Sequence, residues 1–358
     1  MNQLSKKAFL ALMSSIVVCF VLFSIKDSTS IRKNIKNEPI NYSYSFDGLS
    51  FLKTFYLMKQ GVSFYDANIY AIQHDARQGP PPVFVSGWRL PLTFWVWNVF
   101  AREGEGIWFL FLFCSVISLF ALFDIAKMTS GQIGVLISSF FLTPYFYFAL
   151  TSYQFLLIEW WGLFLFIIGL RFLLRGHINF GILFMLVGIF MRELFLISLG
   201  AIAIAMVLNS KKINYPFIIF SMVFGIYYFF HYQFASETLG ETYHMKLQFF
   251  GQRFGSGGFI FLRQTLAYGT NFFITTQFRI QATLLMLMLT IGGYVSSLVK
   301  RDLFVKQLPF ILVLAVVFVF LLIGAPDNDY WGIVYVPFLP VLFLKIVQDI
   351  VFPRKRIS

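Results

Sequence analysis

The chain is poor in charged residues, which excludes an ordinary soluble domain. Only 12% of its 358 residues are charged, whereas 58% are hydrophobic and the mean hydropathy is +0.76. A soluble domain covers its surface with roughly 25% charged residues. Apolar runs recur along the chain, and about 20 helical residues are enough to cross the hydrocarbon core of a bilayer. The composition therefore predicts an all-α, polytopic membrane protein.

Cysteine is nearly absent as well. Cys19 and Cys114 both fall inside predicted spans, so we expect neither a disulfide framework nor a thiolate metal site. The first apolar run, 8–25, is followed by no small-x-small cleavage site, and we interpret it as an uncleaved helix. The sequence indicates no cofactor, and it leaves a requirement for a divalent metal open.

The chain also lacks a compact basic domain and any recognisable nucleic-acid module, although its formal net charge is +12. We therefore expect no nucleic-acid partner, and we assign the positive charge to loops that orient helices among membrane lipids. Ten spans are predicted, with both termini in the cytoplasm: 8–25, 107–125, 132–150, 155–174, 178–191, 193–209, 214–232, 281–298, 308–324 and 332–348.

The distribution of charge supports this topology. The cytoplasmic segments would hold 14 of the 28 basic residues but only 3 of the 16 acidic ones, a net charge of +11. The exterior would hold the remaining 14 basic and 13 acidic residues, a net charge of +1. Cytoplasmic loops of membrane proteins are enriched in Lys and Arg, as this arrangement requires.

Two long segments are then exterior, 26–106 and 233–280. In the first, Phe51, Leu52, Phe55 and Met58 share one helical face, which predicts an amphipathic helix lying in the membrane interface. The stretch 88–103 is apolar for only about a dozen residues, so we expect an interfacial or re-entrant segment there.

Ionisable residues at the exterior helix ends form the candidate site, because charges near a membrane core are costly and mark function. They come from six separate parts of the chain but share one predicted membrane face: Asp47, Arg89, Glu159, Arg192, Glu193, His244, Arg253, Arg263, Asp327 and Asp329. Simpler interpretations stay open. Arg192 and Glu193 would also suit a solvated turn, and Glu159 a water-facing acid in the aromatic belt.

Acids and arginines at an outer membrane surface suit an anionic amphiphile whose head group reacts there. A lipid-phosphate sugar donor is such a molecule, with its phosphate held by arginine forks and a carboxylate acting as general base. No soluble nucleotide-binding domain is present for a nucleotide-sugar donor.

The order of these features resembles the GT-C superfamily of integral membrane glycosyltransferases, such as protein O-mannosyltransferases and aminoarabinose transferases. The resemblance is one of layout over residues 8–210, from "YSFDGLSFLKTFYLMKQGVSFYDANIY" through "SGWRLPLTFWVW" and Glu159 to "MREL". It implies that Asp47 is the catalytic base. Departures include Leu90, where relatives have a second proline, and Gly332, near the final helix, where many carry an arginine.

The leading hypothesis is an inverting glycosyltransferase on the outer face of the cytoplasmic membrane, with inversion implied by the resemblance. Arg253, Arg263 and Arg192 would neutralise the phosphate of a polyprenyl-phosphate-linked sugar donor. Glu159 and Glu193 would orient a glycan, lipid or protein acceptor, or hold the arginines. The chain 1–358 would be one membrane domain, with the catalytic module at 8–210 and C-terminal helices at 211–358.

Two alternatives remain. An O-antigen-type polysaccharide polymerase is also polytopic, but it usually carries its major exterior loop late in the chain. A lipid-linked sugar transporter or flippase would need a charged path through the bilayer, whereas the predicted spans 132–150 and 308–324 contain no charge.

Overall fold

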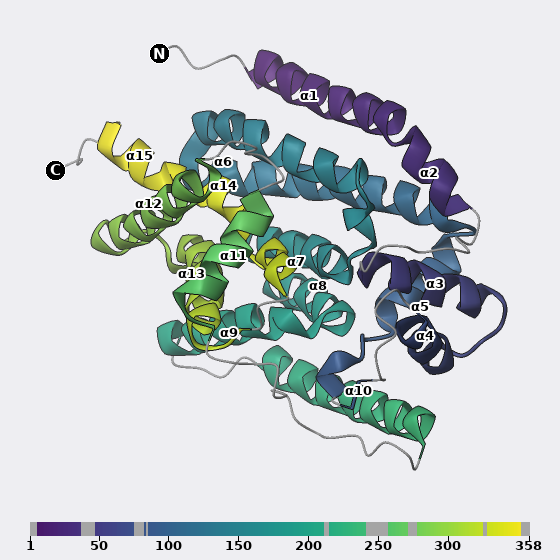
Figure 1. Cartoon of the computed structure of the whole chain (residues 1–358). Coiled ribbons are helices and arrows are strands. Elements are labelled where there is room, and N and C mark those ends of the chain that lie inside the picture. The colour runs from purple at the N-terminus through teal and green to yellow at the C-terminus, as the bar shows by residue number, and fades with distance from the viewer. Residues whose placement is uncertain are drawn as a thin grey trace.

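The computed structural model describes residues 6–36, 47–74, 82–83, 85–210, 215–240, 257–270, 278–324 and 328–351. Within these residues the regular elements are helices and no strand occurs, which confirms the predicted all-α class (Figure 1). From the N-terminus to the long helix α6, the elements are α1 (Lys6–Asp27), α2 (Thr29–Lys36), α3 (Asp47–Lys59), α4 (Phe64–Gln73), η1 (Val85–Gly87), α5 (Leu92–Phe100) and α6 (Gly104–Leu150).

The remaining elements complete the bundle. They are η2 (Tyr153–Leu156), α7 (Ile158–Leu174), α8 (Ile178–Met191), η3 (Glu193–Phe195), α9 (Leu196–Ser210), α10 (Tyr215–Leu239), α11 (Gly258–Thr270), α12 (Arg279–Val299), α13 (Phe304–Leu322), η4 (Asp329–Val334), η5 (Val336–Phe338), α14 (Leu339–Leu342) and α15 (Leu344–Val351).

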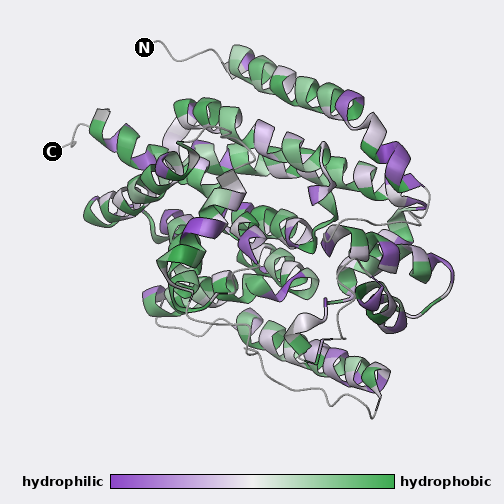
Figure 2. Ribbon diagram, in the orientation of Figure 1, coloured by the Kyte–Doolittle hydropathy of each residue, from purple (hydrophilic) through white to green (hydrophobic). Residues whose placement is uncertain are grey.

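Seven helical stretches of the described chain are long and apolar enough to cross a membrane, by length and composition. They are Lys7–Asp27, Gly104–Leu150, Glu193–Ser210, Tyr215–Leu239, Ile280–Val299, Phe304–Leu322 and Asp329–Ile350. Figure 2 shows that these helices are mostly hydrophobic along their length. A polytopic membrane protein is therefore supported. Each of the ten predicted ranges overlaps helix within its described residues, but the number of spans stays a prediction.

The 47-residue helix α6 is two helices joined at one residue. Gly131 adopts φ 66° and ψ −163°, a conformation open in practice only to glycine, and the chain bends there. This bend falls between the predicted spans 107–125 and 132–150. One glycine therefore gives the turn that the charge pattern placed near Lys127.

Gly131→Ala is expected to lower the free energy of unfolding by about 1–3 kcal/mol, because a β-carbon strains this backbone conformation. Chemical unfolding in detergent, followed by tryptophan fluorescence, measures the change. Gly200→Ala is the matched control: Gly200 lies within α9, and a β-carbon there would meet no atom within 4 Å. Its stability should stay the same or rise, and equal losses in the two variants would contradict the account of the bend.

The described part of the first long loop packs against the helix bundle. The predicted apolar face of α3 exists, since Phe51 and Phe55 are buried. It packs on protein, however: the Phe51 and Phe94 rings lie 5.8 Å apart, and those of Phe55 and Trp97 lie 6.4 Å apart. The apolar face of α3 therefore covers protein, and a position of this helix in the membrane interface stays a prediction. Helix α5 has nine residues, about 14 Å, and is too short to cross a bilayer, as expected.

The ion pairs between described residues separate into two groups at opposite ends of the bundle. At one end, which we call the basic end, Asp124 pairs with Arg171 and Arg175, and Lys345 pairs with Asp302 and Asp349. The other end, which we call the loop end, carries α2–α5, and Arg32 pairs with Glu105 there at 2.9 Å (Figure 1).

The two ends agree with the charge pattern of the sequence. The ion pairs within the described chain join residues that the topology places on the same side of the membrane. Helix α7 connects the loop end to the basic end. Glu159 lies in its first turn and Arg171 in its last turn, about 18 Å apart along the helix axis.

Candidate functional site

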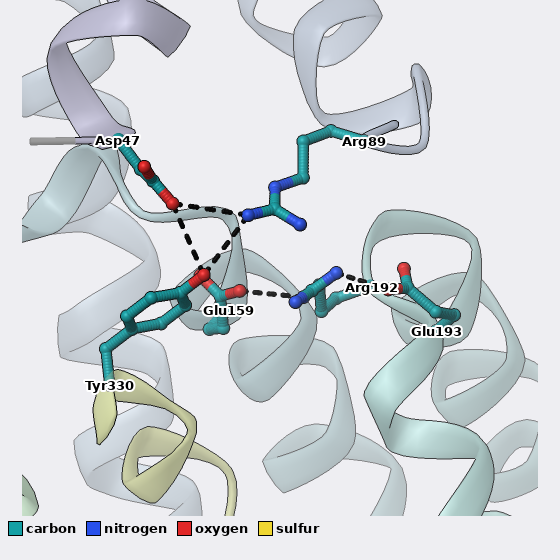
Figure 3. A network of polar contacts seen from close by, with 6 residues as sticks. All are labelled: Asp47, Arg89, Glu159, Arg192, Glu193 and Tyr330. Atoms are coloured by element: carbon teal, nitrogen blue, oxygen red, sulfur yellow. Dashed lines mark hydrogen bonds and ion pairs between the residues drawn. The ribbon is translucent and has the colours of Figure 1, made fainter. Parts of the chain in front are cut away.

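Six polar residues meet at the loop end in one network (Figure 3). They come from the first loop, from the start of α7, from the turn after α8 and from η4: Asp47, Arg89, Glu159, Arg192, Glu193 and Tyr330. Five of the six were selected from the sequence. The structure thus brings together residues that are separated by up to 283 positions.

Arg89 and Tyr330 both contact Asp47. It opens α3, where a negative charge is favoured by the helix dipole. Its Oδ2 lies 3.2 Å from Nη2 of Arg89 and accepts a hydrogen bond from the Tyr330 hydroxyl at 3.3 Å. Nη2 of Arg89 also donates to the Tyr330 oxygen at 3.1 Å, which closes a triangle. The side chains of Asp47 and Arg89 are 18% and 14% exposed, so a ligand can reach this triangle.

Arg89 is held firmly in its charged form. Burial by itself would lower its pKa, but Tyr330, Asp47, Glu159 and Glu193 together raise the pKa above the ordinary value for arginine. Its guanidinium carbon also lies 5.7 Å from the centre of the Phe51 ring, on the inward face of α3. Arg89 therefore supplies a permanent positive charge beside the candidate base.

Arg192 is buried, which corrects two expectations. Its side chain is 1% exposed; Nε lies 2.7 Å from Glu159 Oε1, and Nη1 pairs with Glu193. A solvated turn is therefore wrong, and so is a surface position from which Arg192 would contact a donor phosphate. The Glu159 side chain is also 1% exposed, so it is not a water-facing acid. The expectation that these glutamates hold an arginine agrees with the geometry.

Close helix packing explains why Glu159 and Arg192 meet. A β-carbon added to Gly162 would lie 3.1 Å from the Gly188 carbonyl oxygen, and one on Gly188 would lie 3.0 Å from that of Gly162. The added carbon on Gly162 would also come within 2.6 Å of the Phe195 ring. These two glycines let α7 and α8 approach closely, and this brings the first turn of α7 against the end of α8.

Tyr330 is the site residue that the sequence analysis missed. It lies in "APDNDYW", from which only Asp327 and Asp329 were selected. The hydroxyl of Tyr330 bridges Asp47 and Arg89, so the C-terminal segment contributes directly to the site. The one feature of the sequence that points to Tyr330 is its position next to an acidic residue, in a short polar segment between two apolar runs. Asp329 is half-buried and acts electrostatically on Tyr268, a neighbour of Tyr330.

The other predicted residues are not part of this network. Arg263 is exposed on α11. His244, Arg253 and Asp327 lie outside the described residues, so their roles stay predictions. Among the residues that the structure describes, no group of three or more His, Cys, Asp or Glu side chains is placed to hold a metal ion.

Comparison of the chain with known protein families, with curated proteins and with solved structures gives no match. The features of the chain that bear on its function are the geometry of the site and its place at the end of a bundle of apolar helices.

Proposed function

We propose that the protein is a membrane glycosyltransferase of GT-C-like layout. It would transfer a sugar from a polyprenyl-phosphate donor to a glycan, lipid or protein acceptor on the outer face of the cytoplasmic membrane. One observation carries the proposal: a partly exposed carboxylate, Asp47, is fixed by Arg89 and Tyr330 at the loop end of an apolar helix bundle. A lipid-borne substrate would bring its head group to this level.

The proposed reaction needs one base and one leaving group. Asp47 would accept the proton of the acceptor hydroxyl while the acceptor oxygen forms a bond to the anomeric carbon of the sugar. The bond from that carbon to the phosphate oxygen breaks, and polyprenyl phosphate leaves with the electron pair. Inversion at the anomeric carbon follows from the family resemblance.

The buried residues of the network also favour the proposed chemistry through their charges. Glu159 and Glu193 share Arg192, and both carboxylates act electrostatically on Arg89. Rigid charged neighbours in a poorly solvated site need no reorganisation during the reaction. Arg253 and Arg263 remain the proposed contacts of the donor phosphate in the second exterior loop.

The proposed orientation predicts which positions can be labelled from outside. In a variant whose Cys19 and Cys114 are replaced by serine, Glu237→Cys should react with a membrane-impermeant maleimide on intact cells. Leu303→Cys at the basic end should react only after the cells are opened. Glu237 and Leu303 are both exposed, so accessibility within the protein is matched. The reverse pattern would overturn the topology and move the site to the cytoplasmic face.

The chemistry can be tested by offering purified protein a panel of labelled undecaprenyl-phosphate sugars together with a membrane extract as acceptor source. Transfer should consume donor and release undecaprenyl phosphate in equal amounts. If donors are consumed without a glycosylated product, the protein is a hydrolase or requires another acceptor class. If none of the panel is consumed, the proposal fails for those donors.

A further inference from the structure

An apolar groove of about 440 Å³ lies between α1 and the last turns of α6. The two helices pack against each other, and α1 lies at the edge of the bundle (Figure 1). Small side chains leave the space between them: Ser15 and Cys19 line the groove on α1, and Thr143 and Pro144 line it on α6. The exposed lining is almost entirely apolar, so the groove suits a hydrocarbon chain better than water.

The length of the groove matches one leaflet of a bilayer. Ser15, Cys19, Phe23 and Asp27 follow one another at intervals of four residues, so they share one face of α1. From Ser15 to Asp27 this face extends about 18 Å along the helix axis. The hydrocarbon core of a bilayer is about 30 Å thick, so each leaflet contributes about 15 Å. One acyl chain of a phospholipid in that leaflet therefore fits the groove, with its head group at the loop end.

The groove ends at a carboxylate. Asp27 is exposed in the last turn of α1, and its Oδ2 accepts a hydrogen bond from the Tyr147 hydroxyl at 2.5 Å. Within the described chain Asp27 forms no ion pair with a lysine or arginine, and its Oδ1 accepts no hydrogen bond. A carboxylate at the level of the lipid head groups attracts a cationic group and repels an anionic one.

A hydroxyl without a partner lies deeper in the groove. Thr143 Oγ1 is buried and forms no hydrogen bond to the part of the chain that the structure describes. Thr143 precedes Tyr147 by four residues, so it lies on the same face of α6, about 6 Å farther from the loop end. A diacyl phospholipid has ester carbonyl oxygens just inside its head group, and these accept a hydrogen bond. A polyprenyl chain has no oxygen at this depth, so Thr143 favours a phospholipid as the occupant.

We propose that the groove binds a phospholipid with a primary ammonium in its head group, such as phosphatidylethanolamine. One acyl chain fills the groove, Thr143 donates to an ester oxygen, and the ammonium donates to Asp27. Such a bond between an ammonium and a carboxylate is stronger than a bond between neutral groups. Lys26 precedes Asp27 and is exposed, so it is available to the phosphate of the same head group. Two adjacent charges of opposite sign thus match a zwitterionic lipid.

This site is separate from the proposed sugar transfer. None of the residues that line the groove belongs to the network around Asp47, and lipid binding requires no sugar donor. Among the described elements, α1 packs mainly on α6 and α2. A lipid that contacts both α1 and α6 therefore holds α1 on the bundle. Because a ligand of the folded state stabilises that state, the lipid should also raise the Tm of the protein.

The test uses phospholipids that carry a photoactivatable diazirine in one acyl chain. Full-length protein in phosphatidylcholine vesicles with a small fraction of the probe is irradiated, digested and analysed by mass spectrometry. The phosphatidylethanolamine probe should label peptides containing 15–27 and 143–147 roughly tenfold more than phosphatidylcholine or phosphatidylglycerol probes with the same chains. This is the effect of about one hydrogen bond between charged groups. Other lipid-facing peptides should show no preference for a head group.

Two pairs of variants separate the head group from the chain. Asp27→Asn still accepts a bond from Tyr147 but has no charge, so labelling by phosphatidylethanolamine should fall to the level of phosphatidylcholine. Asp66→Asn is its control, because Asp66 is exposed at the loop end outside the groove. Cys19→Phe fills the groove and should reduce labelling by all three probes. Val18→Phe, at an exposed position of α1 that does not line the groove, should not.

Thermal unfolding in detergent checks that each variant is folded. Added phosphatidylethanolamine should raise the Tm of the wild type and of Val18→Phe, and it should leave that of Cys19→Phe unchanged.

The outcomes are distinct. Equal labelling of the groove peptides by the three probes indicates ordinary annular lipid only and overturns the proposal, as does an unchanged preference in Asp27→Asn. Displacement of the probe by unlabelled undecaprenyl phosphate also overturns it, because the groove would then hold the donor chain. Displacement by unlabelled phosphatidylethanolamine but not by undecaprenyl phosphate supports it. No sugar donor is present, so this result and the result on sugar transfer stand or fall independently.

Discussion

Asp47→Asn is expected to lower sugar transfer by about 10²- to 10⁴-fold, the usual contribution of a positioned general base. The amide has nearly the same shape as the carboxylate and can still accept a hydrogen bond from Tyr330, so the site should keep its form. It cannot accept a proton at neutral pH. Initial rates with a labelled undecaprenyl-phosphate sugar, at saturating donor, measure the effect on kcat directly.

Asp66→Asn is the matched control for this substitution. Asp66 lies on the same exterior loop, is exposed and accepts a hydrogen bond from Ser63 at the start of α4 at 2.6 Å. Its transfer rate should equal that of the wild type. Full turnover by Asp47→Asn would remove Asp47 as the base, and an equal loss in both variants would indicate a general effect of loop charge.

Arg192→Met is expected to lower the free energy of unfolding by about 3–5 kcal/mol, because it breaks a buried ion pair and leaves the Glu159 carboxyl without the guanidinium that it contacts. The long apolar side chain of methionine fills much of the same volume, so the change isolates the charge rather than a cavity. Thermal unfolding in detergent, compared with the wild type at equal protein concentration, measures the loss.

A double variant controls for this effect. Glu159→Gln with Arg192→Met removes both buried charges and should recover a large part of the lost stability, since the cost comes from the unpaired partner. A solvated turn would behave differently: surface substitutions usually change stability by less than about 0.5 kcal/mol. A loss that small in Arg192→Met would contradict the buried network.

The all-α class and the presence of several long apolar helices could be predicted because they depend on simple sequence patterns. Apolar length marked the spans, and the spacing of Phe51 and Phe55 marked the inward face of α3. The convergence of Asp47 with Arg89 and Glu159 also followed from topology, because the charge distribution placed all three at one membrane face. Charged residues are costly near a membrane core, so the positions of the charged residues in the sequence indicate where a site lies.

The burial of Arg192 could not be predicted in the same way. Two adjacent charges between apolar runs are equally consistent with an exposed turn and a paired buried site. The difference depends on how closely α7 and α8 approach, which Gly162 and Gly188 decide through contacts between distant segments. Helix spacing at this level is a property of packing, and no local pattern in the sequence reports it.

Tyr330 was missed for a related reason. The chain contains 17 tyrosines and 48 phenylalanines, so one more aromatic residue gives no distinct signal. Its role appears only when η4 folds back against the start of α3, 283 positions away in the sequence. What α3 covers could not be predicted either, since an apolar face that packs on lipid has the same spacing as one that packs on Trp97.

The most direct test of the central claim is the stoichiometry of the reaction in sealed vesicles whose loop end faces outward. The wild type should convert externally added undecaprenyl-phosphate sugar into glycosylated acceptor and free undecaprenyl phosphate in a ratio of about 1:1, and Asp47→Asn should not. Movement of intact donor across the membrane without release of undecaprenyl phosphate would contradict a transferase and favour a transporter.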